Sequence, residues 1–291
     1  MNISEYKIKF IRNEIEKSYL NACHFDINCI KPGNVNIHTS HTDTTAEDFI
    51  TSYAVTSKII ATPNIGLGER IENSIIATKK NVKTNTNLGI ILLCSLFSQS
   101  LSLKKDITLS EAIRDVVLNC EKLDLSKICN AITIANPGGL GAHEQHDVRS
   151  DIKITLSELM QISSEYDQIS RQYSLFFEDI FNFIIPNLHK SLSMIPDVKL
   201  AISYTFLKTL AKYPDSHISR KYGDKIAKKT SNEAYDLLKI LDGDTRHESW
   251  GTNLMSLDKH FKMARVNPGA TADLLVVSMM IYDYYIGLAN Q

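Results

Sequence analysis

The chain has 291 residues, of which 43% are hydrophobic and 22% are charged. This composition is ordinary for a globular protein, and the length suits one large domain or two closely packed ones. The 32 Lys and Arg residues nearly balance the 33 Asp and Glu residues, so the net charge favours neither nucleic acid nor an anionic membrane as a partner. Anionic small molecules stay open as ligands, because they need only a local cluster of cations.

The N-terminal segment and the cysteines both predict a cytoplasmic protein. Residues 1–7 lack the basic region and apolar run of a signal peptide. The longest apolar stretches, Leu88 to Phe97 and Leu274 to Ile281, are shorter than the ~20 residues of a membrane-spanning helix. The five cysteines form no C-x-x-C pair, which favours reduced, buried thiols over a metal or redox site. The oligomeric state cannot be read from the sequence.

Helical periodicity dominates the chain. Three- and four-residue steps predict a first amphipathic helix at Ile11, Ile15, Tyr19 and Ala22. Capping boxes predict three further helix starts, at Thr44-x-x-Glu47, Thr108-x-x-Glu111 and Thr155-x-x-Glu158. An apolar stripe from Ile226 to Leu241 and a strongly apolar segment from about Thr271 to Leu288 predict the last helices.

Evidence for strands is thin, since alternations such as Val35-x-Ile37 are short and lie beside Pro and Gly. No internal repeat or low-complexity linker divides the chain. We therefore expect an all-α fold, with a single compact multi-helix domain over residues 1–291 and an active site formed by the loops between helices.

Five polar segments lie between the predicted helices. They are Lys31–Asn36 with His38, His41 and Asp43; Lys83–Gly89; Ala135–Gly141 with His143, His146, Asp147 and Arg149; Tyr213–Lys221; and Arg265–Asp273. Gly, Pro and Asn are typical of any helix–helix turn. A plain turn does not need Lys, Arg, His and Asp, however, and the start of the helix that follows such a loop favours anions.

Two of these segments allow sharper interpretations. Asn136-Pro-Gly-Gly-Leu-Gly141 is not a P-loop, because no Lys-Ser/Thr pair follows, and no strand precedes it as in a dinucleotide fingerprint. After Pro214, Asp215 is expected to cap a helix that carries Arg220 and Lys221 in its first two turns. This arrangement is compatible with a solvated helix start or with an anion site.

In this order, the segments resemble those of the triphosphoribosyl-dephospho-CoA synthase family, known from the maturation of citrate lyase and malonate decarboxylase. The resemblance covers about Lys31 to Asp273 and rests on Lys31-Pro-Gly-Asn-Val-Asn36 with Asp43, Asn85-Thr-Asn-Leu-Gly89, Pro214-Asp-Ser-His-Ile-Ser-Arg220 with Gly223, and Asn267-Pro-Gly-Ala-Thr-Ala-Asp-Leu274. It implies an all-helical transferase that joins the triphosphoribosyl part of ATP to the 2′-hydroxyl of 3′-dephospho-CoA and releases adenine.

Two motifs depart from those of the members that serve citrate lyase. Gly33-Asn-Val-Asn36 stands where those members have a Gly-Leu-Val-Asp type of sequence, and Asn85-Thr-Asn-Leu-Gly89 replaces an Asn-Thr-His-Lys-Gly type of run. The second version resembles a branch found in archaea and other microbes. The resemblance therefore implies the reaction class, with dephospho-CoA or a related molecule as the acceptor.

The implied chemistry assigns roles to the residues of these loops. Displacing adenine from C1′ requires help for the leaving base, a base for the acceptor hydroxyl, and neutralisation of the triphosphate, which suits Mg²⁺. We expect Asp43 and Asp215 to be catalytic. The expected metal ligands are Asp43, Asp147, Asp215 and Asp273. The expected substrate-binding residues are Lys31, Asn34, Asn36, Asn85, Asn87, Arg149, His217, Arg220, Lys221, Arg265 and Asn267.

Two other functions stay open at this point. A helical metal-dependent nucleotide phosphohydrolase would bring a transition metal to His38, His41, His143, His146 and Asp147. A non-catalytic nucleotide-binding module would bind ATP without releasing adenine.

Overall fold

The structure, a computed structural model, describes residues 2–39, 44–137 and 154–288. These residues form fourteen α-helices and no β-strand. The helices are α1 (Arg12–Asn28), α2 (Ala46–Ile60), α3 (Leu67–Asn81), α4 (Leu88–Leu101), α5 (Leu109–Leu118), α6 (Lys122–Ala135), α7 (Leu156–Ser163), α8 (Gln168–Ser174), α9 (Ile185–Met194), α10 (Val198–Lys212), α11 (Ser216–Tyr222), α12 (Asp224–Gly243), α13 (Trp250–Met263) and α14 (Gly269–Tyr285). A 3₁₀ turn, η1 (Ile3–Glu5), and a π-helical turn, η2 (Ile180–Ile184), complete the set. The predicted all-α fold is confirmed.

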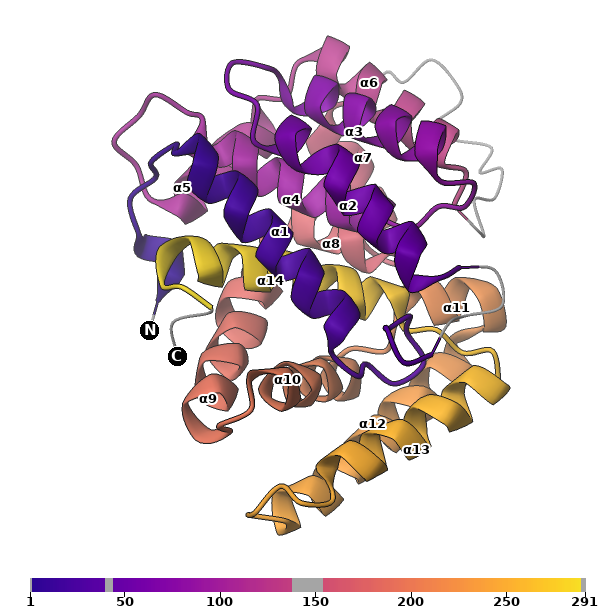
Figure 1. The fold of residues 1–291 in the computed structure, drawn as a ribbon. Coiled ribbons are helices and arrows are strands. Elements are labelled where there is room, and N and C mark those ends of the chain that lie inside the picture. The colour runs from indigo at the N-terminus through magenta and orange to yellow at the C-terminus, as the bar shows by residue number, and fades with distance from the viewer. Residues whose placement is uncertain (1, 40–43, 138–153, 289–291) are drawn as a thin grey trace.

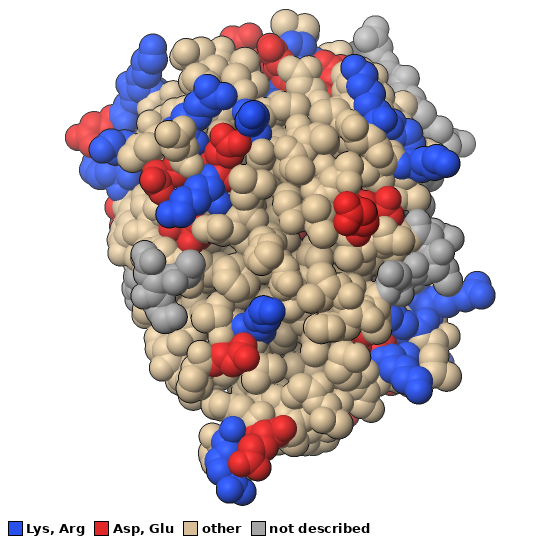
Figure 2. Space-filling view, in the orientation of Figure 1, with Lys and Arg blue, Asp and Glu red and all other residues tan. Residues whose placement is uncertain are grey.

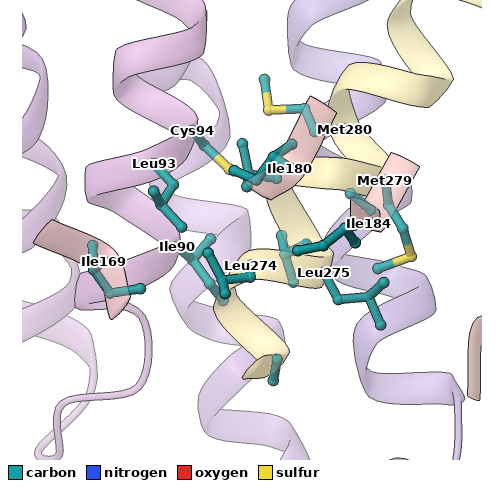
Figure 3. Close-up of a cluster of buried hydrophobic side chains, with 14 of the residues drawn as sticks. Ile90, Leu93, Cys94, Ile169, Ile180, Ile184, Leu274, Leu275, Met279 and Met280 are labelled. Atoms are coloured by element: carbon teal, nitrogen blue, oxygen red, sulfur yellow. The ribbon is translucent and has the colours of Figure 1, made fainter. Parts of the chain in front are cut away.

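Helix α14 is the centre of the hydrophobic core. It packs against α1 and α4, and α9 and α10 lie on its other side (Figure 1). Leu274, Leu275, Met279 and Met280 of this helix meet side chains of α4 and η2 in one apolar cluster (Figure 3). A helix that is apolar nearly all round is buried in this way because several neighbours cover it.

Local sequence signals set most of the helix starts. Thr108 with Glu111 and Thr155 with Glu158 form the predicted capping boxes. The first box was predicted one residue too early, since Thr45 and Asp48 form it rather than Thr44 and Glu47. The Asp48 carboxylate accepts a hydrogen bond from Thr45 N at 2.8 Å. The sequence allows both assignments, because Thr44 and Thr45 are each followed three residues later by an acidic residue.

Surface and thiol features agree with the composition. The face in Figure 2 shows positive and negative side chains interspersed around a broad central area with few charges. All five cysteines are free thiols, and four of them are buried. Of the helices in the described ranges, none is long and apolar enough to cross a membrane.

Candidate active site

A cavity of about 680 Å³ opens where the start of α4, the start of α14 and helix α11 meet the ends of α3 and α6 and the helices α7 and α8. Its volume lies within the range of small-molecule sites, about 300–1,000 Å³. All five predicted polar segments contribute residues to its wall, including Asn34, Asn85, Asn136, His217 and Asn267. Segments far apart in sequence therefore converge on one site.

The first and last predicted segments are joined directly. Asn34 donates from Nδ2 to Asn267 Oδ1 at 2.9 Å. Gly33 has φ of +83°, and a Cβ there would lie 2.7 Å from Val266 O, so this close approach of the two backbones requires glycine. Asp258 of α13 fixes the same loop by accepting from Gly33 N at 2.9 Å.

Lys31 lies behind this wall, in a buried ion pair. Its ammonium is 2.5 Å from Asp26 Oδ1 and donates to Asn34 Oδ1 at 2.5 Å, and the Lys31 side chain is completely buried. Asp26, by contrast, reaches the cavity lining. Burial raises the pKa of Asp26, and the Lys31 charge acts against this rise. Through these contacts, Lys31 fixes the side chains of Asp26 and Asn34. None of its contacts supports the predicted role in phosphate binding.

Asp273 is the unpaired carboxylate of the cavity. It lines the wall from the second turn of α14 and has no hydrogen-bond or ion-pair partner among the described residues. Desolvation raises the pKa of Asp273 well above its usual value, and the charges of Asp26 and Asp215 add to the rise. A carboxylate of this kind is poised to gain a cation or a proton.

Gly89 allows that carboxylate to reach the start of α4. A Cβ at Gly89 would lie 2.1 Å from Asp273 Oδ2, so only glycine leaves room for the Asp273 side chain. Gly89, Ile90 and Ala270 line the cavity, and their N–H groups have no acceptor among the described residues. Free N–H groups at helix starts favour anionic ligands.

Two predicted asparagines arrange the loop before α4. Asn85 accepts from Leu88 N through Oδ1 at 3.2 Å. Asn87 donates from Nδ2 to Thr78 Oγ1 at 3.1 Å, and its Oδ1 is buried without a partner. Asn87 lines the cavity, and its amide therefore keeps an unsatisfied acceptor oxygen enclosed behind the surface of the wall.

Asp215 connects two helix starts. It is fully buried and caps α11 by accepting from His217 N at 2.8 Å and Ile218 N at 3.1 Å. Its other oxygen accepts from Thr271 N at 2.7 Å and Thr271 Oγ1 at 2.8 Å. With both oxygens occupied and no place in the cavity lining, Asp215 has contacts that support the site rather than enter it.

His217 follows Asp215 and enters the cavity beside Gly269. A Cβ on Gly269 would lie 2.6 Å from His217 Nδ1, so the missing side chain makes room for the imidazole. Burial lowers the pKa of His217, as do the Arg220 and Lys221 charges, against the opposing pull of Asp215. The imidazole is therefore neutral at pH 7 and able to accept a proton.

Cations surround the cavity. Arg220 forms an ion pair with Asp167, and Lys221 and Arg265 line the wall on the same side. The end of α3 and the loop after it add Lys79 and Lys83. This excess of cations at a cavity with free N–H groups fits a polyanionic ligand.

The structure brings together nine of the predicted site residues in the cavity wall: Asn34, Asn85, Asn87, His217, Arg220, Lys221, Arg265, Asn267 and Asp273. Lys31 and Asp215 support the wall from behind. Asn36 does the same, because its Oδ1 accepts from His38 N at 3.0 Å and Thr39 N at 3.1 Å within its own loop. Asp43, Asp147 and Arg149 lie outside the described residues.

Sequence reasoning missed Asp26 and Lys79. A signal for Asp26 existed, because it continues the buried stripe of α1 through Tyr19 and Ala22, where an acid is out of place. Of the histidines proposed for a transition metal, His38 is exposed, and His41, His143 and His146 lie outside the described residues. No group of three or more His, Cys, Asp or Glu residues within the described ranges is arranged to hold a metal ion.

Comparison with known proteins shows a match to one protein family and to solved structures. The family described as ATP:dephospho-CoA triphosphoribosyl transferase matches residues 12–288. A crystal structure from Archaeoglobus fulgidus, provisionally described as a triphosphoribosyl-dephospho-CoA synthase, matches with a TM-score of 0.59 and 21% identity, covering 81% of this chain and 96% of that one. At this identity, the likeness shows the fold. No curated protein matches the chain.

Proposed function

The chain belongs to the ATP:dephospho-CoA triphosphoribosyl transferase family, and we propose that its cavity is where the triphosphoribosyl group of ATP passes to the 2′-hydroxyl of 3′-dephospho-CoA, with release of adenine. The observation that carries this proposal is the position of the unpaired Asp273 carboxylate beside the free N–H groups of α4, in a cavity surrounded by cations.

In this proposal, the triphosphate binds at the starts of α4 and α14 and at the neighbouring cations. The N–H groups of Gly89, Ile90 and Ala270 offer three donors, and Arg220, Lys221 and Arg265 offer charge. Arg220 already pairs with Asp167, so it is held in one orientation toward the cavity. Neutralising the triphosphate keeps ATP bound while the bond to adenine breaks.

Mg²⁺ is proposed to join the triphosphate at Asp273. The unpaired Asp273 carboxylate is a hard oxygen donor, and Asp26 adds a second carboxylate to the same wall. Mg²⁺ needs only one or two protein carboxylates when substrate phosphates complete its shell, so this donor set fits. When bound, the ion supplies positive charge to the phosphates and relieves the repulsion between Asp26 and Asp273.

His217 is proposed to take the proton of the acceptor hydroxyl. Its lowered pKa keeps the imidazole neutral at pH 7, which a general base requires. Asp215 holds the backbone of His217 in place through the cap of α11. In this arrangement, Asp215 is a positioning residue rather than a group that touches substrate.

The proposal is tested by incubating the protein with ATP, Mg²⁺ and 3′-dephospho-CoA and following free adenine by chromatography. Adenine should form only when both substrates are present, together with a product heavier than dephospho-CoA by one triphosphoribosyl group. Inorganic phosphate in place of adenine would favour a phosphohydrolase, and ATP binding without any product would favour a non-catalytic module.

A further inference from the structure

One wall of the cavity is built from aliphatic side chains and takes no part in the proposed chemistry. Helix α7 contributes Leu159, Met160 and Ile162, and α4 and α6 contribute Leu92 and Ile132. No charged side chain comes from the α7 part of this wall. We call these five residues the aliphatic wall.

The aliphatic wall runs from the interior to the surface. Leu92, Leu159 and Met160 are buried, with 6%, 5% and 4% of their surfaces exposed. Ile162, which lies within one helical turn of Leu159 and Met160 on α7, is 44% exposed while still lining the cavity. The exposed aliphatic surface of Ile162 at the cavity mouth can be buried by an apolar part of a ligand. Because the exposed fraction of these side chains rises toward the surface, the wall suits an extended ligand that leaves the cavity rather than one enclosed in it.

From this wall, and on the basis of the proposed function, we propose that the acceptor's pantetheine arm lies along α7 and leaves the cavity over Ile162. 3′-Dephospho-CoA consists of adenosine diphosphate joined to that arm, which is long and flexible and carries aliphatic segments on either side of two amide groups. The polar and charged side chains around Asp273 and Arg220 suit the phosphates, so the aliphatic wall is left for the arm. The wall therefore makes the site specific for an acceptor that carries an apolar arm.

The adenine ring of ATP is the competing occupant, and the wall suits it less well. A purine in a cavity is held by stacking on aromatic rings and by hydrogen bonds to its edge. Leu159, Met160 and Ile162 offer neither, and the nearest such groups along the chain, Ser163 and Tyr166, lie at the end of α7 and just beyond it. A leaving adenine also needs a proton or a hydrogen bond, and an aliphatic surface cannot supply one.

The test measures binding of 4′-phosphopantetheine to the protein saturated with ATP and Mg²⁺, by titration calorimetry. This probe has the arm and one phosphate but lacks the ribose that supplies the acceptor 2′-hydroxyl. The variants are Met160→Gln, which changes the buried part of the wall, and Ile162→Gln, which changes the exposed part at little risk to folding. Leu123→Gln is the control, because Leu123 is 66% exposed on α6 and does not line the cavity.

The wild-type protein should bind the probe, and Kd should rise about tenfold in each wall variant, the order expected when an apolar contact is lost. Kd for ATP should stay unchanged in both, and the control should behave as wild type. Absence of binding, or an unchanged Kd in both wall variants, overturns the proposal. Weaker ATP binding in those variants would assign the wall to adenine and overturn it as well.

These outcomes are separate from those of the adenine assay. Adenine release without binding of the arm would leave the proposed function standing and remove only this inference. Binding of the arm at the wall without adenine release would count against the proposed function and leave the arm subsite standing.

Discussion

Gly89 and Asp273 meet across 184 residues of sequence, at the point where the start of α4 faces the second turn of α14. A Cβ on Gly89 would lie 2.1 Å from Asp273 Oδ2 and 2.7 Å from its Cγ. The carboxylate therefore occupies the space that any other residue at position 89 would fill. The geometry of the proposed Mg²⁺ ligand depends on this one missing side chain.

Gly89→Ala should displace the Asp273 carboxylate and lower kcat about 100-fold, the cost of a displacement of about 1 Å at an active site. Stability should change little, because alanine favours a helix over glycine by up to about 1 kcal/mol and offsets part of the clash. Steady-state adenine release measures the first effect and thermal unfolding the second. Gly251→Ala on α13 is the control, since a Cβ there meets no atom within 4 Å. Equal rates in the two variants would contradict the assignment.

Asp273→Asn should stabilise the Mg²⁺-free protein at neutral pH. The raised pKa means that the folded protein holds the Asp273 proton more tightly than the unfolded chain. Its stabilising contribution is therefore complete below the ordinary Asp pKa of about 3.9 and is lost as pH rises through the folded-state pKa. We expect Tm of the variant to exceed that of wild type at pH 7 by roughly 2 °C or more. The gap should close toward pH 4.

Thermal unfolding across that pH range checks the sign of the effect. Asp106→Asn serves as the control, because the Asp106 side chain is 91% exposed, and it should show no such gain. A variant less stable than wild type at pH 7 would mean that Asp273 has a favourable partner in the folded protein.

Asp215→Asn should weaken the fold as well as the activity. Both carboxylate oxygens accept hydrogen bonds, one from the start of α11 and the other from Thr271. In either orientation of an Asn amide, its NH₂ group would face N–H donors and could not accept from them. The cost should be about 1–3 kcal/mol of unfolding free energy, measured by urea denaturation. Thr271→Val removes only the hydroxyl contact at 2.8 Å and should cost less. Loss of turnover in Asp215→Asn at unchanged stability would restore the catalytic role expected from the sequence.

The buried ion pair of Asp26 and Lys31 should behave as a unit in stability measurements. Lys31→Met alone leaves the Asp26 carboxylate buried without its counter-charge, at a cost of about 3–5 kcal/mol. The double variant with Asp26→Leu should recover most of that loss, because two well-packed apolar side chains replace the pair. Unfolding free energies of the two single variants and the double variant test this. Additive losses would show that the two side chains are independent.

The sequence predicts those parts of the fold that local chemistry decides. The boxes at Thr108 and Thr155 and the cap at Asp215 lie within four residues of the helices they start. The apolar composition of the α14 segment is enough to predict a buried helix. The first capping box was placed at Thr44 instead of Thr45 because both registers satisfy the same local rule.

The site itself depends on packing that no local pattern encodes. Asn36 is predicted to bind substrate, but its side-chain oxygen accepts a hydrogen bond from Thr39 N within the same turn. Lys31 reads like a phosphate-binding residue, yet α1 places Asp26 against it. The surroundings of Asp273 depend on where α4 packs, and the sequence near Asp273 does not specify that position. The sequence therefore indicates which loops form the site. It does not indicate which of their side chains line the cavity and which hold the wall from behind.

The most direct measurement of the central claim is adenine release by wild type and Asp273→Asn, side by side, with ATP, Mg²⁺ and 3′-dephospho-CoA at saturation. Wild type should release adenine only when the acceptor is present, and Asp273→Asn should retain its fold while its rate falls at least about 100-fold, a loss of about 2.7 kcal/mol in transition-state stabilisation. A rate in the variant within threefold of wild type would contradict the assignment of this cavity wall to the transfer.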